Sequence, residues 1–181
     1  MFGSIAFVVW RESVEALLVI GILDAWLRAE TRDTGRARVF LWGGVVAGLA
    51  FAGLLAAVLV RLGEAISEEA QLTYTTVVVL VAAALILQMV FWMRKHGRSM
   101  KRDLEAQLSI AVVRRSWWGV FVLALVAVAR EGSETVIFLY GILSSGAAGD
   151  LLSGVGAGLF GFALALLSYG LLQAGSRVLS W

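Results

Sequence analysis

The sequence predicts an all-α integral membrane protein with five transmembrane helices. Hydrophobic residues make up 60% of its 181 positions, charged residues only 15%, and the mean hydropathy is +0.89. This composition is typical of membrane proteins and does not fit a soluble domain with a large core. The apolar residues also fall into five segments, each close to the ~20 residues that cross the hydrocarbon core of a bilayer.

The five predicted helices cover residues 4–27, 39–60, 72–93, 117–143 and 151–174. The first is read as a membrane helix and not as a cleavable signal peptide, because Arg11, Glu12 and Glu15 interrupt its apolar run. A polar stretch, 94–115, separates the third helix from the fourth. Its latter part has apolar residues at helical spacing and is expected to form an amphipathic helix on the membrane surface.

The distribution of Lys and Arg predicts the orientation of these helices. Twelve of the 15 basic residues lie after the first, third and fifth segments, whereas Arg61 alone lies on the opposite side. Because basic loops stay in the cytoplasm, the chain is expected to lie in the cell (inner) membrane with its N-terminus outside the cell and its C-terminus in the cytoplasm. The chain has no cysteine, and its one histidine, His96, lies in a basic segment. A metal site at membrane depth must therefore be built from oxygen ligands.

One five-residue pattern occurs twice inside the apolar segments, as R-E-S-V-E at 11–15 and R-E-G-S-E at 130–134. A charge at the centre of a membrane helix costs roughly 2.5–3.5 kcal/mol on insertion. Three such residues in one helix oppose insertion unless they are paired and face inward, and intramembrane charges usually mark a functional site. The duplication suggests one site built from two halves.

The two halves also match outside the motif. Each motif helix continues to a Gly-Ile-Leu triplet and is followed by a glycine-rich helix. With three helices per unit, the halves would cross the membrane in opposite directions, as in inverted-topology repeats. We therefore divide the chain into a first repeat, 1–96, a cytoplasmic amphipathic linker, 97–115, and a second repeat, 116–181, which lacks its third helix. The glycine pairs 44/48 and 154/158 are expected to permit close helix packing.

On a helix, the arginine and both glutamates of each motif lie within about 100° of arc. Arg11 can pair with Glu15, and Arg130 with Glu134. If these two helix faces are turned toward each other, they bring together two supporting guanidinium groups and four carboxylates, those of Glu12, Glu15, Glu131 and Glu134. The formal charge of −2 calls for protons or a cation, and four carboxylates suit Fe³⁺, Mn²⁺, Ca²⁺ or Mg²⁺ better than Cu⁺ or Zn²⁺. The alternative is a pair of structural ion pairs joining helices, which leaves Glu12 and Glu131 unexplained.

Three further glutamates, Glu64, Glu68 and Glu69, lie in the predicted outer loop between the second and third helices. They are candidates for capturing cations near the entrance. The alternative is a helix N-terminus, with Ser67 as the cap and the two acidic residues that follow it in the first turn.

The doubled R-E-x-x-E motif, the external N-terminus and a third helix that ends F-W-M-R-K-H at 91–96 resemble the oxidase-dependent iron permeases of fungi and bacteria. The resemblance covers essentially the whole chain. It implies that the four motif glutamates bind and pass iron with Arg11 and Arg130 beside them, and that an extracytoplasmic oxidase or iron-binding protein delivers Fe³⁺. Family members usually have seven membrane helices, so this chain is either truncated or completed by a homo-oligomer or partner helices.

The leading hypothesis is an inward Fe³⁺ permease in the lipid bilayer, with iron as cargo and no tightly bound cofactor. The alternatives are a proton-coupled carrier of Mn²⁺ or Pb²⁺, and a non-transporting subunit whose Glu/Arg pairs relay protons or stabilise a complex. An enzyme is not expected, because the chain has no histidine at membrane depth and no cofactor motif. Nothing in the sequence suggests a nucleic-acid partner.

Overall fold

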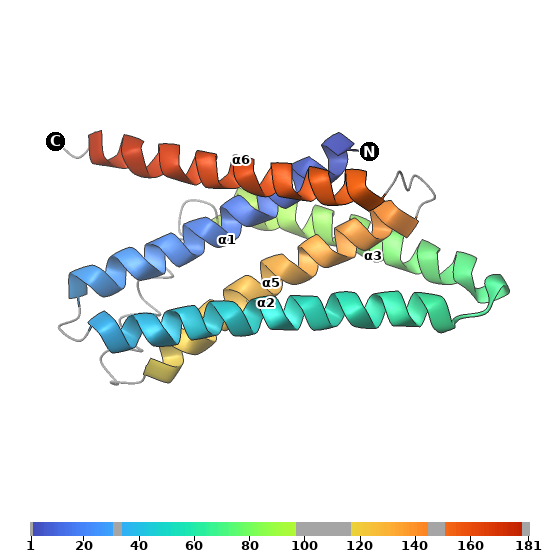
Figure 1. Ribbon diagram of the computed structural model, residues 1–181, viewed down its shortest axis with the longest axis horizontal. Helices are drawn as coiled ribbons and strands as arrows, with labels where there is room; N and C mark the ends of the chain where they lie inside the picture. Colours follow the sequence, from blue (N-terminus) through green and yellow to red (C-terminus); the bar gives the residue numbers. More distant parts are fainter. Residues whose placement is uncertain (1, 31–33, 97–116, 145–150, 179–181) are drawn as a thin grey trace.

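The computed structural model describes residues 2–30, 34–96, 117–144 and 151–178, which form five α-helices and, within these ranges, no β-strand. All five predicted segments are helical, so the all-α class is confirmed. The expected surface helix falls at 97–115, outside the described residues. With the labels of Figure 1, the helices are α1 Phe2–Glu30, α2 Thr34–Ala65, α3 Glu68–His96, α5 Trp117–Ser144 and α6 Leu151–Val178.

Each helix has 28 to 32 residues, and all five extend beyond the predicted segment at one or both ends. At 1.5 Å per residue the helices are about 42–48 Å long, whereas the hydrocarbon core is about 30 Å thick. The prediction counted only apolar residues, and the helices continue into polar ends. Three helices, α2, α3 and α6, are long and apolar enough to cross a membrane by composition alone. The other two, α1 and α5, carry the charged motifs.

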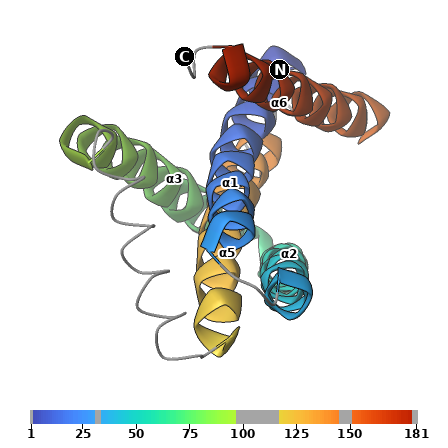
Figure 2. The ribbon, with the colours of Figure 1, turned by 90° about the vertical axis from the view of Figure 1, so that its left-hand side faces the viewer.

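The helices pack as two crossed pairs. The most extensive contacts join α2 to α5 and α1 to α6, while α1 and α5 meet between these pairs. Figure 1 shows α2 and α5 below α1 and α6, and Figure 2 shows α3 leaning away from the others. In this arrangement the first helix of each half packs against the second helix of the other half. A two-fold relation between the halves would produce the same pairing.

Glycines allow the close packing of α2 against α5 and of α1 against α6, although one of the glycines predicted to do so makes no such contact. A Cβ on Gly44 or Gly48 would lie 2.9 or 2.8 Å from side-chain carbons of α5, which confirms that this pair permits close packing. The prediction for Gly158 is wrong, because nothing lies within 4 Å of its Cβ position. The close approach on α6 is made by Gly161, whose added Cβ would collide with the backbone of Ala6.

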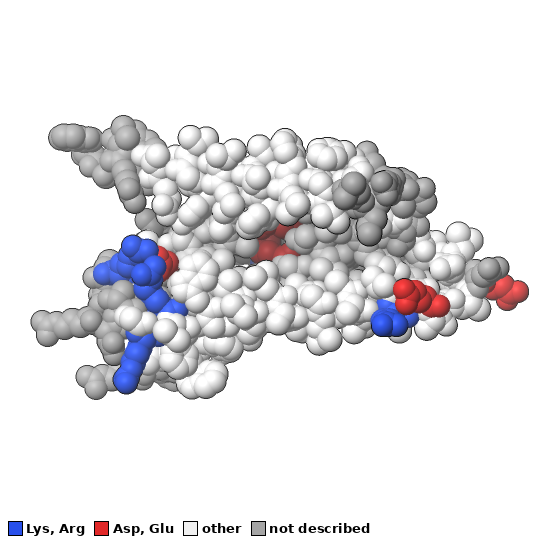
Figure 3. All heavy atoms as spheres, in the orientation of Figure 1, with Lys and Arg blue, Asp and Glu red and all other residues white. Residues whose placement is uncertain are grey.

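Two apolar clusters fix the directions of α1 and α5. The end of α1 at Leu27, the start of α2 at Ala37 and the start of α5 at Val120 lie in one buried cluster. A second cluster joins the start of α1 to the part of α5 near Ile142. The two motif helices are therefore antiparallel. We call the end of the molecule that holds the exposed Arg28 and Arg36 and the half-buried Arg38 the arginine-rich end; basic residues gather there in Figure 3.

Candidate metal centre in the helix core

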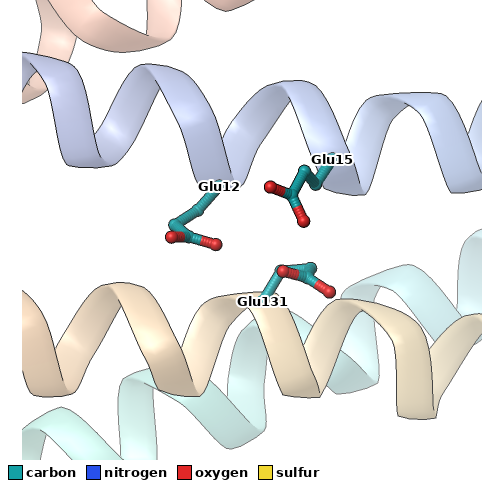
Figure 4. A group of neighbouring side chains, drawn as sticks. All are labelled: Glu12, Glu15 and Glu131. Atoms are coloured by element: carbon teal, nitrogen blue, oxygen red, sulfur yellow. The ribbon is translucent and has the colours of Figure 1, made fainter. Parts of the chain in front are cut away.

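The two motifs meet where α1 crosses α5, near the middle of both helices. Figure 4 shows Glu12 and Glu15 on α1 turned toward Glu131 on α5. One carboxylate oxygen from each of the three residues lies within 4.8 Å of those of the other two. Figure 3 shows acidic atoms at mid-length, surrounded by uncharged residues. The structure therefore gathers three of the four predicted ligands into one group.

Each arginine pairs with the glutamates of its own helix. Arg11 lies 3.4 Å from Glu15 and 3.6 Å from Glu12, measured from guanidinium nitrogen to carboxylate oxygen. In the second motif, Arg130 Nε lies 3.2 Å from Glu134 Oε1 and 3.8 Å from Glu131 Oε1. The closer contact in each motif is the predicted i,i+4 pair, and its arginine Nε–H donates to the carboxylate. These ion pairs link residues within one helix and do not join helices.

The carboxylates are buried with unused hydrogen-bonding capacity. Glu12 is 2% exposed, Glu134 7% and Glu131 9%. Both oxygens of Glu12, together with Oε2 of Glu131 and of Glu134, have no hydrogen-bond partner among the described residues. A buried polar atom without a partner costs about 1–3 kcal/mol, and more when it is charged. Four carboxylates beside two guanidinium groups carry a formal charge of −2, so the group as a whole favours a bound cation or protons.

The geometry suits an oxygen-bound cation after a small closure. Oxygens on opposite sides of an ion with bonds of about 2.0–2.6 Å are separated by roughly 4–5 Å, and neighbouring ligands are closer. The observed limit of 4.8 Å is near the upper end of that range. Three carboxylates from two helices are thus positioned to bind one ion with modest side-chain movement, and the described residues around them offer no thiol or imidazole ligand.

Glu134 lies beside this group and is not part of it. Its Oε1 accepts from Arg130, and its carboxylate is near enough to interact electrostatically with Glu12 and Glu15. The hydroxyls next to it, on Ser133 and Thr135, donate to carbonyls of their own helix and are therefore already satisfied.

The predicted outer glutamates lie at the α2–α3 end, apart from the acidic atoms at mid-length (Figure 3). Glu64 is 66% exposed and 3.9 Å from the more exposed Arg61, and Glu69 is exposed in the first turn of α3. The carbonyl of Ser67 accepts from the backbone N–H groups of Ala70 and Gln71, so α3 begins here as expected. The side chain of Glu68 is outside the described set. These residues fit a helix start, and their role in cation capture stays a prediction.

The sequence reading missed a close contact inside the second motif. A Cβ on Gly132 would lie 2.7 Å from the Cβ of Ala52 on α2, so only glycine fits here without a shift. The corresponding residue of the first motif is Ser13, which shows that the two copies differ where α2 touches one of them. The difference between Ser and Gly at this motif position was the one feature of the sequence that could have indicated the contact.

Two polar contacts hold α1 in place at either side of its motif. Trp10 Nε1 donates to Ser168 Oγ on α6 at 3.0 Å. Toward the arginine-rich end, Asp24 accepts from Arg28 at 2.9 Å and from Arg38 of α2 at 2.7 Å. Asp24 therefore links α1 to α2.

Comparison with known proteins gives a consistent result. The chain matches the iron permease FTR1 family over residues 1–177. It is 34% identical over 132 residues to the ferrous iron permease EfeU of Escherichia coli O157:H7, covering 71% of this chain and 47% of that protein. The figures for EfeU of Yersinia pestis are 32% over 137 residues, 73% and 47%. A protein of E. coli K12 named as a putative inactive ferrous iron permease EfeU is 33% identical over 132 residues.

The chain spans about half the length of the curated relatives it matches. No solved structure matches it. The family match covers both motif helices and every described helix, with the doubled motif at the crossing point of the fold. The chain belongs to the iron permease FTR1 family.

Proposed function

We propose that this protein binds iron between α1 and α5 through Glu12, Glu15, Glu131 and Glu134, and carries it across the cell membrane into the cytoplasm. The observation that supports this most directly is the convergence of three carboxylates from two helices, of which Glu12 and Glu131 are buried and have oxygens without a hydrogen-bond partner among the described residues. Membership of an iron permease family supports iron as the cargo. A permease moves its cargo without covalent chemistry, so no catalytic residue is proposed.

The positions of the arginines argue against a purely structural role for the motifs. The ion pairs that Arg11 and Arg130 form with the motif glutamates each lie within a single helix, so these pairs do not fasten α1 to α5. They offset part of the repulsion between neighbouring carboxylates and leave oxygen atoms directed into the crossing. If the motifs formed ion pairs alone, the buried Glu12 would have no hydrogen-bond partner among the described residues.

We propose Fe³⁺ as the preferred oxidation state, because Coulomb attraction to a site of charge −2 grows with the charge of the cation. The relatives are named ferrous iron permeases, which supports Fe²⁺ as the alternative to be measured beside it. An extracytoplasmic oxidase or iron-binding protein that presents Fe³⁺ is the partner this preference requires. A carrier of Mn²⁺ or Pb²⁺ would use the same oxygen ligands, so only a competition experiment between the metals distinguishes it from an iron carrier.

The proposed direction follows from charge. Twelve basic residues on one side favour a cytoplasmic arginine-rich end, with the first residues of α1 outside the cell. The pairing of α1 with α6 and of α2 with α5 supports the two repeats, 1–96 and 116–181, joined by the linker 97–115. In that scheme α3 covers α5, and a helix from a longer chain, a second copy or a partner would occupy the equivalent position beside α1.

The test is metal binding and uptake by the purified chain. In nanodiscs, Fe³⁺, Fe²⁺ and Mn²⁺ are compared by competition, and in proteoliposomes by uptake. Glu12→Gln removes one buried charge without changing the side-chain volume, and we expect folded protein that has lost binding. Gly53→Ala on α2, where nothing described lies within 4 Å of an added Cβ, is the control. Normal binding and uptake by Glu12→Gln, or a preference for Cu⁺ or Zn²⁺, would refute the glutamate site.

A further inference from the structure

The four motif glutamates lie at two depths along the helix axes. Glu12 and Glu15 are three residues apart, as are Glu131 and Glu134, which separates each pair by about 4.5 Å along its helix. Because α1 and α5 are antiparallel, the two steps run in opposite directions. Glu15 is nearer to the arginine-rich end than Glu12 is, and Glu131 is nearer to that end than Glu134 is.

This arrangement allows two different sets of three carboxylates, and the structure assembles only one of them. Glu12, Glu15 and Glu131 have oxygens within 4.8 Å of one another, whereas Glu134 is outside this group. Glu15 and Glu134 are each paired with the arginine four residues earlier. A two-fold relation between the motifs exchanges Glu12 with Glu131 and Glu15 with Glu134. The counterpart of the observed set is therefore Glu131, Glu134 and Glu12. Both sets contain Glu12 and Glu131 and differ in the third carboxylate.

Glu134 has what the second set requires. It is 7% exposed, and its Oε2 is buried without a hydrogen-bond partner in the described chain. It is also within electrostatic reach of Glu12 and Glu15. Only its Oε1 is engaged by Arg130, at 3.2 Å. A rotation of this side chain would bring a third carboxylate to Glu12 and Glu131 from the side away from the arginine-rich end.

We propose that these glutamates form two overlapping three-carboxylate sites, an outer one completed by Glu134 and an inner one completed by Glu15. A cation from outside meets Glu134 first, is held in turn by both sets through Glu12 and Glu131, and leaves past Glu15. The transfer exchanges one carboxylate for another, so the ion keeps at least two charged ligands throughout. Glu15 keeps its pairing with Arg11 while it belongs to the observed set, and we expect Glu134 to keep Arg130 in the same way. This inference rests on the proposed function and on the proposed orientation.

Two variants form a matched pair for the test. Glu15→Gln and Glu134→Gln each remove one carboxylate that pairs with an arginine four residues earlier, so their effects on charge and ion pairing are equivalent. Equilibrium binding of Fe³⁺ citrate, and of Mn²⁺ as a second probe, is measured on the full chain in nanodiscs. Because the structure contains the inner set, Glu15→Gln should weaken binding at least about tenfold more than Glu134→Gln does.

The second measurement is the rate of metal loading in sealed vesicles, which does not depend on complete transport. With metal added to the outer face, Glu134→Gln should load about tenfold more slowly than wild type, and Glu15→Gln should load normally. In inside-out vesicles the two variants should exchange their behaviour. Equal effects of both variants in binding and in both orientations would overturn the two sites, and the opposite assignment would overturn their order.

Glu12→Gln separates failure of this inference from failure of the proposed function. If Glu12→Gln abolishes binding while the matched pair behave alike, the glutamate site stands and the two-depth order is wrong. If Glu12→Gln binds metal like wild type, the proposed site itself is wrong, and the two overlapping sites with it.

Discussion

Gly132 offers the sharpest test of how the fold positions the proposed metal ligands. It lies between Glu131 and Glu134, and a Cβ added to it would be 2.7 Å from the Cβ of Ala52. Ordinary contacts of this kind are 3.4–4 Å. In Gly132→Ala the helices α2 and α5 must therefore separate locally by about 1 Å, which is the difference between the two values.

The expected effect on stability is small, and the effect on metal binding is larger. Overpacking costs about 1–3 kcal/mol, and replacing a helical glycine by alanine returns about 0.5–1 kcal/mol. A metal site, however, tolerates ligand shifts of only about 0.2 Å. Moving α5 by 1 Å displaces Glu131 from Glu12 and Glu15. Gly132→Ala should thus unfold at nearly the wild-type temperature while its affinity for Fe³⁺ falls by an order of magnitude or more.

The control and the rescue come from the same contact. Ala52→Gly removes the methyl group that the new Cβ would meet, so the double variant Ala52→Gly/Gly132→Ala should recover metal binding. Gly53→Ala, one residue further along α2, has nothing within 4 Å of its new Cβ and should bind normally. Affinity is measured by metal competition in nanodiscs, and stability by thermal unfolding. Wild-type affinity in Gly132→Ala, or a double variant that binds no better than the single, would refute the packing argument.

Three further predictions follow from the motifs and the ends of the helices. Arg11→Ala should lower the free energy of unfolding by about 3–5 kcal/mol, because it leaves buried carboxylates without a counter-charge, whereas Glu12→Gln should stay folded; thermal unfolding of both distinguishes them. Affinity for Fe³⁺ should fall as pH falls, since protons compete for the same oxygens, and competition at two pH values measures this; a pH-independent affinity would exclude carboxylate ligands. A reporter placed in 97–115 should be cytoplasmic and one near Glu69 external, and labelling by an impermeant reagent in the reverse pattern would invert the proposed direction.

Much of this fold follows from one-dimensional properties of the chain. Apolar length determines where the helices lie, and the 100° step of a helix puts Arg11, Glu12 and Glu15 on one side of α1. Both i,i+4 ion pairs could be read from spacing alone, because they depend on a single helix. The helix ends were less accurate, since the polar residues that continue each helix beyond the apolar segment carry no hydropathy signal.

Contacts between helices could not be read in the same way. Glycines four residues apart share a face, but their spacing does not say which face meets a neighbour. On α6 the contact face holds Ala157, Gly161 and Ala165, all buried, and Gly158 lies off it. The choice of Glu15 over Glu134 as the third member of the observed carboxylate group is equally invisible in the sequence. It depends on side-chain rotamers at a crossing of two equivalent motifs.

The closed end of the molecule bears on how iron could leave the site. Between Glu15 and the arginine-rich end, Leu23 and Leu27 of α1 pack against Leu41 of α2 and Val120 of α5, and all four are 0% exposed. A buried apolar cluster offers no ligands to a cation and none to its hydration water. Release toward this end therefore requires α1 to separate from α2 and α5 there. The Asp24–Arg38 bridge joins α1 to α2 at the same level and would open in that movement. Release from the proposed inner set would then depend on breaking these helix contacts.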